Sequence, residues 1–372
     1  MQFQDFEKGP FVFAAIKALA GMGVFNSDGE RWKFHRTTTR PFFNKARISD
    51  FDNFERHAVS TISQIKPRLR EGYPIDFQDV VARFTMDSAT EYLFGKDVNS
   101  IAAGLPYPAG SPMAGSLHFI NHPSNSFVKA FVKAQEKIVI RTQKSPSWPL
   151  SELWADEVQL LWEVINGFVQ PMLSEALGRK AKGSTSVGSD KDLESMSLLD
   201  HPKVVQDELI NIFIAGRDTM SSSTSSLLTF AVYMMCEHPD MVAQLQSEIL
   251  KKVGTGKPTY DDIRDMKYLR AFLNGVLFCF SASLMPSFSI SSSRVVTTLP
   301  NRGRTPYYIP CNTRVVYSVF LMHRRTDLWG PDALKFDLDR FLDSRMHKYL
   351  TPNPFIFAPF NAGPRSTCVS NL

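Results

Sequence analysis

The chain has 372 residues, with 42 Lys and Arg against 37 Asp and Glu, which gives a formal net charge of +5. Its basic residues are interleaved with apolar ones and form no dense stripe, so we expect no nucleic-acid partner. Four widely spaced cysteines exclude a zinc ribbon and argue against a disulfide framework. The sequence shows no signal peptide and no charge-free apolar run long enough to span a bilayer.

Apolar residues at helical spacing recur along most of the chain. A helix is predicted to begin near Asp28, because residues 26–28 offer capping oxygens, and to end before Pro41. Other helical segments are predicted at 51–65, 80–94, 128–141, 150–177, 241–252 and 260–273. A loop is expected at 105–125 and a flexible linker at 180–190, because small and polar residues dominate both.

The longest helical segment follows Pro202 and continues to about Glu237, where His238 and Pro239 close it. At 1.5 Å per residue it would be roughly 50 Å long, enough to cross a whole domain. Its apolar character indicates that it is buried. Strand patterns are few, and the best lie at 294–299 and 313–319. The predicted fold class is therefore mainly α with a minor β portion.

The long helix carries an unusual run at 215–219. Ala215 and Gly216 have almost no side chain, so a flat cofactor could lie against them, and glycine is unfavourable inside a helix without a reason. Thr219 lies one turn after Ala215, and its hydroxyl can bond a carbonyl and loosen the turn. Asp218 is a charge in an apolar segment and a candidate proton relay. Taken alone, the run favours a packing notch with a solvated aspartate.

Two further groups of residues could hold a cofactor. Trp32 and Arg36 are four apart on one predicted helix, so an indole N–H and a guanidinium could hold a carboxylate together, although a surface cation–π pair is the usual explanation. Near the end of the chain stand Phe360, Gly363, Arg365 and Cys368. The glycine would let the backbone turn closely past a flat ring, the arginine could meet a propionate, and the cysteine could ligate iron as a thiolate.

Four segments, taken together and in chain order, resemble cytochromes P450. They are Gly29 to Arg36, the 215–219 run, Phe336 to Phe341, and 357–365 with Cys368. The stretches 23–32 and 215–219 look most like fungal enzymes that hydroxylate alkanes and fatty acids. The resemblance covers nearly the whole sequence and implies one P450-like domain over 1–372, with the P450 fold.

The resemblance also implies an activity, a cofactor and partners. The enzyme would be a monooxygenase that inserts one oxygen atom of O2 into a small apolar substrate. Haem b would have Cys368 as its iron ligand, and its pocket would include Trp32, Arg36, Ala215, Gly216, Phe360, Gly363 and Arg365. Asp218 and Thr219 would be catalytic and deliver protons during oxygen activation. Electrons would come from NADPH through a flavin-containing P450 reductase, and the full-length protein would be held at the cytosolic face of the endoplasmic reticulum membrane.

The sequence departs from the family pattern in several places. Gly275 and Phe278 stand where a Glu-x-x-Arg pair is expected to meet Arg340, so Arg340 is predicted to lose its buried partner, at a cost of about 3–5 kcal/mol. Residues 275–294 are expected to derive from a wrong reading frame or a retained intron. Two residues separate Arg365 from Cys368, instead of one, and Ser370 stands where the pattern has glycine. We also expect an N-terminal anchor and a C-terminal segment to be missing, and the alternative is a haem-free remnant without catalysis.

Overall fold

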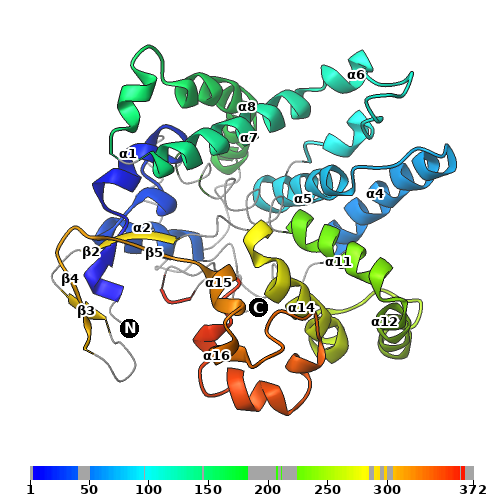
Figure 1. Cartoon of the computed structure of the whole chain (residues 1–372). Coiled ribbons are helices and arrows are strands. Elements are labelled where there is room, and N and C mark those ends of the chain that lie inside the picture. The colour runs from blue at the N-terminus through cyan, green and yellow to red at the C-terminus, as the bar shows by residue number, and fades with distance from the viewer. Residues whose placement is uncertain are drawn as a thin grey trace.

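The computed structural model confirms a mostly helical chain with a small β portion (Figure 1). It describes residues 3–40, 51–95, 97–144, 146–182, 207, 211, 224–284, 289–293, 297–299, 305–360 and 362–364. None of the described helices is long and apolar enough to cross a membrane.

The N-terminal part leads from strand β1 (Phe6–Glu7) into α1 (Gly9–Ala20), then through a 3₁₀ turn into α2 (Gly29–Thr39). The predicted helix near Asp28 is thus confirmed, but its capping is not as expected. The Asp28 carboxylate accepts hydrogen bonds from the backbone N–H groups of Lys8 and Gly9, at 3.0 to 3.1 Å. Asp28 therefore satisfies the free N–H groups at the start of α1 and makes no side-chain cap for α2.

A first hydrophobic core forms where α1 and α5 (Phe77–Phe94) pack against α7 (Pro123–Gln143) and α8 (Glu157–Lys182) (Figure 1). Phe127 packs at its centre, with its ring 4.5 Å from Phe168 and 5.7 Å from Phe131. Phe127 is fully buried and belongs to this core. Helix α4 (Asp52–Arg70) packs on α5, and a short α6 (Leu117–Ile120) lies in the predicted loop.

A second core joins the C-terminal half of the chain. Its members come from the segment 328–357 and from the helices α11 (Ser225–Glu237), α12 (Pro239–Lys252) and α14 (Lys267–Leu284). The predicted single helix over 260–273 is two helices, α13 (Tyr260–Asp265) and the beginning of α14, because the chain leaves the helical conformation at Met266. Two short helices follow, α15 (Val319–His323) and α16 (Thr326–Trp329).

Among the residues that the structure describes, five short strands build the β portion. In the first sheet β2 (Ser289–Ser293) lies between β1 and β5 (Arg314–Tyr317), and both pairings are antiparallel. In the second, β3 (Thr297–Leu299) pairs with β4 (Tyr307–Ile309). The sequence patterns predicted β5 and β3, but not β2, whose serine-rich segment is held by backbone bonds to β1 at the other end of the chain and to β5.

Candidate functional site

Helix α2 presents Trp32 and Arg36 one turn apart, as the sequence predicts, and both side chains are half-buried. The last turn is reinforced by threonine: the hydroxyls of Thr37, Thr38 and Thr39 donate to carbonyls one turn back. An indole N–H and a guanidinium at this spacing suit the two propionates of a porphyrin, so the donor chemistry of the described residues fits haem.

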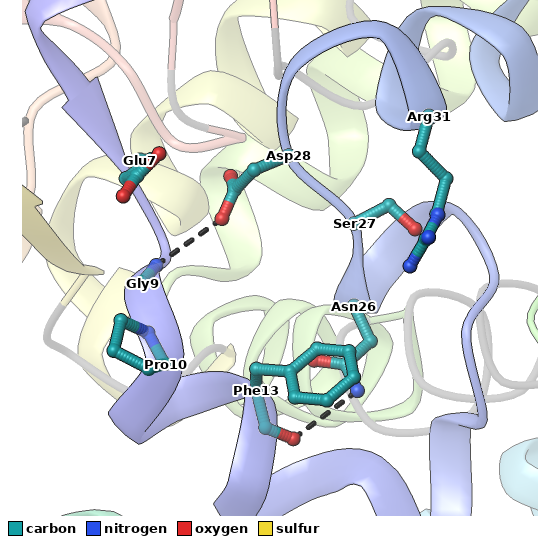
Figure 2. Close-up of a pocket in the computed structure, with 8 residues that line it drawn as sticks. All are labelled: Glu7, Gly9, Pro10, Phe13, Asn26, Ser27, Asp28 and Arg31. Carbon is teal, nitrogen blue, oxygen red and sulfur yellow. Dashed lines mark hydrogen bonds between the residues drawn. The ribbon is translucent and has the colours of Figure 1, made fainter.

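A pocket of about 340 Å³ opens on the N-terminal side of α2, between the start of α1 and the turn at 26–28 (Figure 2). Figure 2 shows the Asp28 bond to Gly9 on one side and the Asn26 amide donating to the Phe13 carbonyl on the other. None of the predicted site residues lines this pocket. We therefore do not identify it with the predicted cofactor site.

The segment that leads to the predicted iron ligand is anchored in the second core. The Ala358 N–H donates to His323 Nε2 at 3.4 Å, and the Phe357 ring stacks 5.2 Å from the imidazole. Phe360 is half-buried, and Gly363 has a φ of +94°, the left-handed region that favours glycine. A backbone that turns in this way just before 365–368 fits the close approach to a flat ring that the sequence predicts.

His323 is fully buried and was not among the candidates from the sequence. Burial lowers the pKa of His323 to about 4, against the opposing effect of a hydrogen bond to the Phe278 carbonyl. The imidazole is therefore neutral at physiological pH, and its Nε2 accepts a hydrogen bond from the Ala358 N–H. The rings of Phe278, Trp329 and Phe357 surround it.

Arg340 is 2 % exposed and, without the Glu-x-x-Arg pair of the family pattern, it has other partners, although its Nη1 is buried with no hydrogen-bond partner among the described residues. Its guanidinium donates to the carbonyls of Asp332, Lys335 and Asp337 at 2.7 to 3.3 Å. It also lies 4.4 Å above the centre of the Phe278 ring. Carbonyl dipoles and an aromatic face thus take the place of the expected ion pair.

Gly275 explains why that arrangement is possible. A Cβ at position 275 would lie 2.7 Å from Leu338 Cδ2 and 3.3 Å from the Phe336 ring. The absence of a side chain lets α14 and the segment 336–341 approach closely, and the same approach leaves no room for the expected glutamate.

The remaining site predictions lie outside the described residues. They are Ala215, Gly216, Asp218, Thr219, Arg365 and Cys368. Two described residues just before the 215–219 run, Asp207 and Asn211, contact the turn between α1 and α2. Sequence reasoning missed both, although the paired glycines Gly21 and Gly23 were a signal of close approach.

The described residues also contain one group of side chains that could ligate a metal. His57, Glu91 and Asp97 place one ligand atom each within 4.8 Å of one another. Glu91 is already bound to His57 at 2.7 Å and to Arg56 at 2.7 and 2.8 Å. Burial acts to raise the pKa of Glu91, but the hydrogen bonds from Arg56 and His57 outweigh it and hold that pKa below its ordinary value. The cluster is therefore an ion-paired contact between α4 and α5.

The helical arrangement with its two small sheets defines the cytochrome P450 fold. A solved structure, the heme domain of a cytochrome P450DA mutant, superposes with a TM-score of 0.70 over 98 % of this chain and 72 % of that one. At 18 % identity this likeness shows the fold alone.

The sequence comparisons then give the family. A model described as Cytochrome P450 matches residues 2–369. The chain is 32 % identical to cytochrome P450 52A6 of Candida tropicalis, over 98 % of this chain and 68 % of that protein. It is 30 % identical to the cytochrome P450 monooxygenase himC of Aspergillus japonicus and 29 % identical to pvhE of Talaromyces variabilis, over 62 % and 66 % of those proteins. The chain belongs to the cytochrome P450 family, and it spans about two thirds of the length of these relatives.

Proposed function

We propose that the protein is a haem-dependent monooxygenase that hydroxylates an apolar substrate. The observation that carries the proposal is the family match over 2–369, which includes all four motif segments. We further propose that 1–372 forms one P450-like domain. The described part supports this reading, because helices of both cores pack on α5 and α11, which contact each other.

The proposed cofactor is haem b, which would supply the iron centre at which dioxygen is activated. Cys368 would be its thiolate ligand, and Trp32, Arg36 and Arg365 would bind the propionates through charge-assisted or N–H hydrogen bonds. Ala215 and Gly216, with Phe360 and Gly363, would give the flat ring room. Asp218 and the Thr219 hydroxyl would hold and pass the protons that oxygen activation consumes.

Fatty acids or alkanes are the proposed substrate class. Support comes from the stretches 23–32 and 215–219, which resemble fungal hydroxylases of such compounds, and from the similarity to the Candida cytochromes P450 of the 52 series. The electron donor would be NADPH, acting through a flavin-containing P450 reductase.

Association with the endoplasmic reticulum membrane is proposed for the full-length protein. One surface feature supports lipid contact. The connection between α7 and α8 exposes Leu150, Leu153 and Trp154, with the indole 99 % exposed. Arg141, buried at the end of α7, pins this connection by bonding Glu152 and Asp156.

The alternative is a haem-free chain of the same fold. The extra residue between Arg365 and Cys368, and Ser370 in place of glycine, favour it. A ligand set displaced by one residue could leave the thiolate unable to reach the iron. Gly275 and Phe278 no longer favour this alternative strongly, because Arg340 has other partners.

Haem uptake separates the two readings. The protein is expressed with haem supplied, reduced, and exposed to CO, and the Soret absorption is recorded. We expect a thiolate-type shift in the wild type, loss of that shift in Cys368→Ala, and an unchanged spectrum in Cys311→Ala, a control at an exposed cysteine. A wild type without haem contradicts the enzyme, and a thiolate spectrum that survives Cys368→Ala contradicts the ligand assignment.

A further inference from the structure

We propose that the pocket on the N-terminal side of helix α2 binds a small zwitterion, a molecule with a primary ammonium group at one end and a carboxylate at the other. The proposal goes beyond the proposed function and does not depend on haem. It rests on side chains from β1, α1, the turn 26–28 and α2, all of which the structure describes (Figure 2).

The pocket is lined by a buried acceptor that lacks a donor. Asn26 is 2 % exposed, and its Oδ1 has no hydrogen-bond partner among the described residues. Its Nδ2 donates to the carbonyls of Phe13 at 3.2 Å and Gly21 at 2.8 Å. Turning the amide over would bring Oδ1 against these two oxygens, so the orientation of the amide is fixed. A buried oxygen is costly to leave unbonded, and an N–H donor from a ligand would satisfy it.

Two carboxylates favour a cationic group in the same pocket. Glu7 and Asp28 both line it, and Figure 2 shows them on the same side. Asp28 is held in place by the backbone N–H groups of Lys8 and Gly9, at 3.0 to 3.1 Å. Glu7 makes no ion pair with another residue that the structure describes. A primary ammonium group has three donors, enough for the Asn26 oxygen and a carboxylate together.

The other side of the pocket carries a positive charge. Arg31 projects from the first turn of α2 toward Ser27 and Asn26 (Figure 2). Within the described part of the chain it has no ion-pair partner. Its guanidinium is a planar fork of donors that suits a carboxylate. Because Arg31 is exposed, its side chain can change rotamer rapidly and let a ligand reach the Asn26 oxygen.

Size and the apolar wall limit the ligand further. The volume of about 340 Å³ is near the lower end of the range of about 300–1,000 Å³ for small-molecule sites. Phe13 and Pro10 form an apolar wall, against which a short methylene chain can pack. A simple amine would leave Arg31 without a counter-charge, and a simple carboxylate would leave the Asn26 oxygen without a donor. A short amino acid satisfies both.

Isothermal titration calorimetry with γ-aminobutyrate tests the site, and three matched probes separate its parts. Butylammonium lacks the carboxylate, butyrate lacks the ammonium group, and γ-(trimethylammonio)butyrate keeps both charges but has no N–H donor. We expect γ-aminobutyrate to bind and each of the other probes to bind at least about tenfold more weakly, because each loses a charge-assisted hydrogen bond. No binding of γ-aminobutyrate at millimolar concentration would overturn the site. Equal binding of the trimethylammonio probe would overturn the role of the Asn26 oxygen.

Variants at accessible positions locate the binding, and circular dichroism checks that each one is folded. Glu7→Gln and Arg31→Gln should each weaken γ-aminobutyrate binding at least about tenfold. Arg31→Gln should not weaken butylammonium, which has no carboxylate to lose. Glu30→Gln is the control, because Glu30 is next to Arg31 but pairs with Lys33 and does not line the pocket. Unchanged affinity for γ-aminobutyrate in Arg31→Gln would place the bound zwitterion elsewhere and refute the proposal, whatever the outcome of the haem experiment.

Discussion

Arg340 is a buried cation whose nearest carboxylate oxygen, on Asp332, is 3.9 Å away. Burial lowers the pKa of Arg340, which reflects the free-energy cost of holding its charge out of water. Three backbone carbonyls, the Phe278 ring and the charges of Asp332 and Asp337 offset part of that cost, while Nη1 has no hydrogen-bond partner among the described residues. The aromatic ring at position 278 can therefore replace part of the charged pair of the family pattern, because its face contacts the guanidinium.

The contribution of this ring can be measured. Phe278→Leu keeps apolar volume but removes the aromatic face, so we expect the free energy of unfolding in urea to fall by about 2–3 kcal/mol. In the background Arg340→Met the same change should cost about 1–2 kcal/mol less. Phe280→Leu is the matched control, because Phe280 lies in α14 like Phe278 but stacks on Phe230 of α11, with ring centroids 4.1 Å apart. Equal costs with and without Arg340 would show that Phe278 acts by packing alone.

His323 gives a pH dependence whose sign follows from its burial. Between pH 6.5 and about 4 the unfolded chain binds a proton at this histidine and the folded chain does not. The free energy of unfolding therefore falls as the pH drops through this window, by about 3 kcal/mol at its lower end. Above pH 6.5 this histidine no longer reduces the stability. We expect His323→Gln to have a shallower fall in unfolding free energy between pH 6.5 and 4 than the wild type. The same change at the exposed His347 is the control, and parallel curves for His323→Gln and the wild type would refute the assignment.

At the scale of elements, α14 can pack closely against the segment 336–341 because Gly275 has no side chain. Gly275 is buried against Leu338 and Phe336, whereas Gly167 in α8 is exposed with open space around it. Both are glycines inside helices, where alanine has the better intrinsic propensity by about 1 kcal/mol. Tertiary packing therefore decides whether alanine is tolerated.

The two glycines make a matched pair for a stability measurement. We expect Gly167→Ala to stabilise the protein by about 0.5–1 kcal/mol. Gly275→Ala should destabilise it by about 1–2 kcal/mol, because overpacking against Leu338 exceeds the gain in propensity. Urea unfolding monitored by circular dichroism measures both. Stabilisation by both substitutions would mean that α14 can move away from the 336–341 segment at little cost.

At the scale of the whole molecule, the two cores are joined through α5 and α11. The Gln78 amide on α5 donates to the Ser226 hydroxyl on α11 at 3.3 Å, and α11 also packs on α14. The connection between α7 and α8, the green helices of Figure 1, lies on the surface. Its apolar side chains Leu150, Leu153 and Trp154 are exposed. Arg141 holds this connection in place by bonding Glu152 and Asp156, and we expect its exposed apolar side chains to contact lipid.

Vesicle binding tests that surface. Replacing Leu150, Leu153 and Trp154 by serine should weaken binding to phosphatidylcholine vesicles by at least about tenfold, since each buried apolar side chain contributes about 1.5–3 kcal/mol. Leu334→Ser, at a leucine with 70 % exposure elsewhere on the surface, is the control. Vesicle flotation gives the bound fraction. Unchanged binding of the triple variant would place any lipid contact elsewhere.

Much of the fold could be predicted from the sequence. Helical periodicity located α2, α4, α5, α7 and α12 within a few residues, because an amphipathic face repeats every turn whatever it packs against. The small sheets were harder, since β2 is serine-rich and its stability comes from partners at 6–7 and 314–317. The motif segments carried the family resemblance that the comparisons confirm.

The sequence by itself determined the mainly helical class, the family and the need for a glycine at 363, whose φ is +94°. Tertiary structure decided which partner each polar side chain has. Asp28 caps α1 instead of its own helix, Arg340 binds carbonyls and a ring, and Asn211 binds a turn 186 residues earlier. The physical reason is that periodicity and capping are local properties of the chain, whereas a buried polar group takes whichever partner the packed structure brings within hydrogen-bond distance.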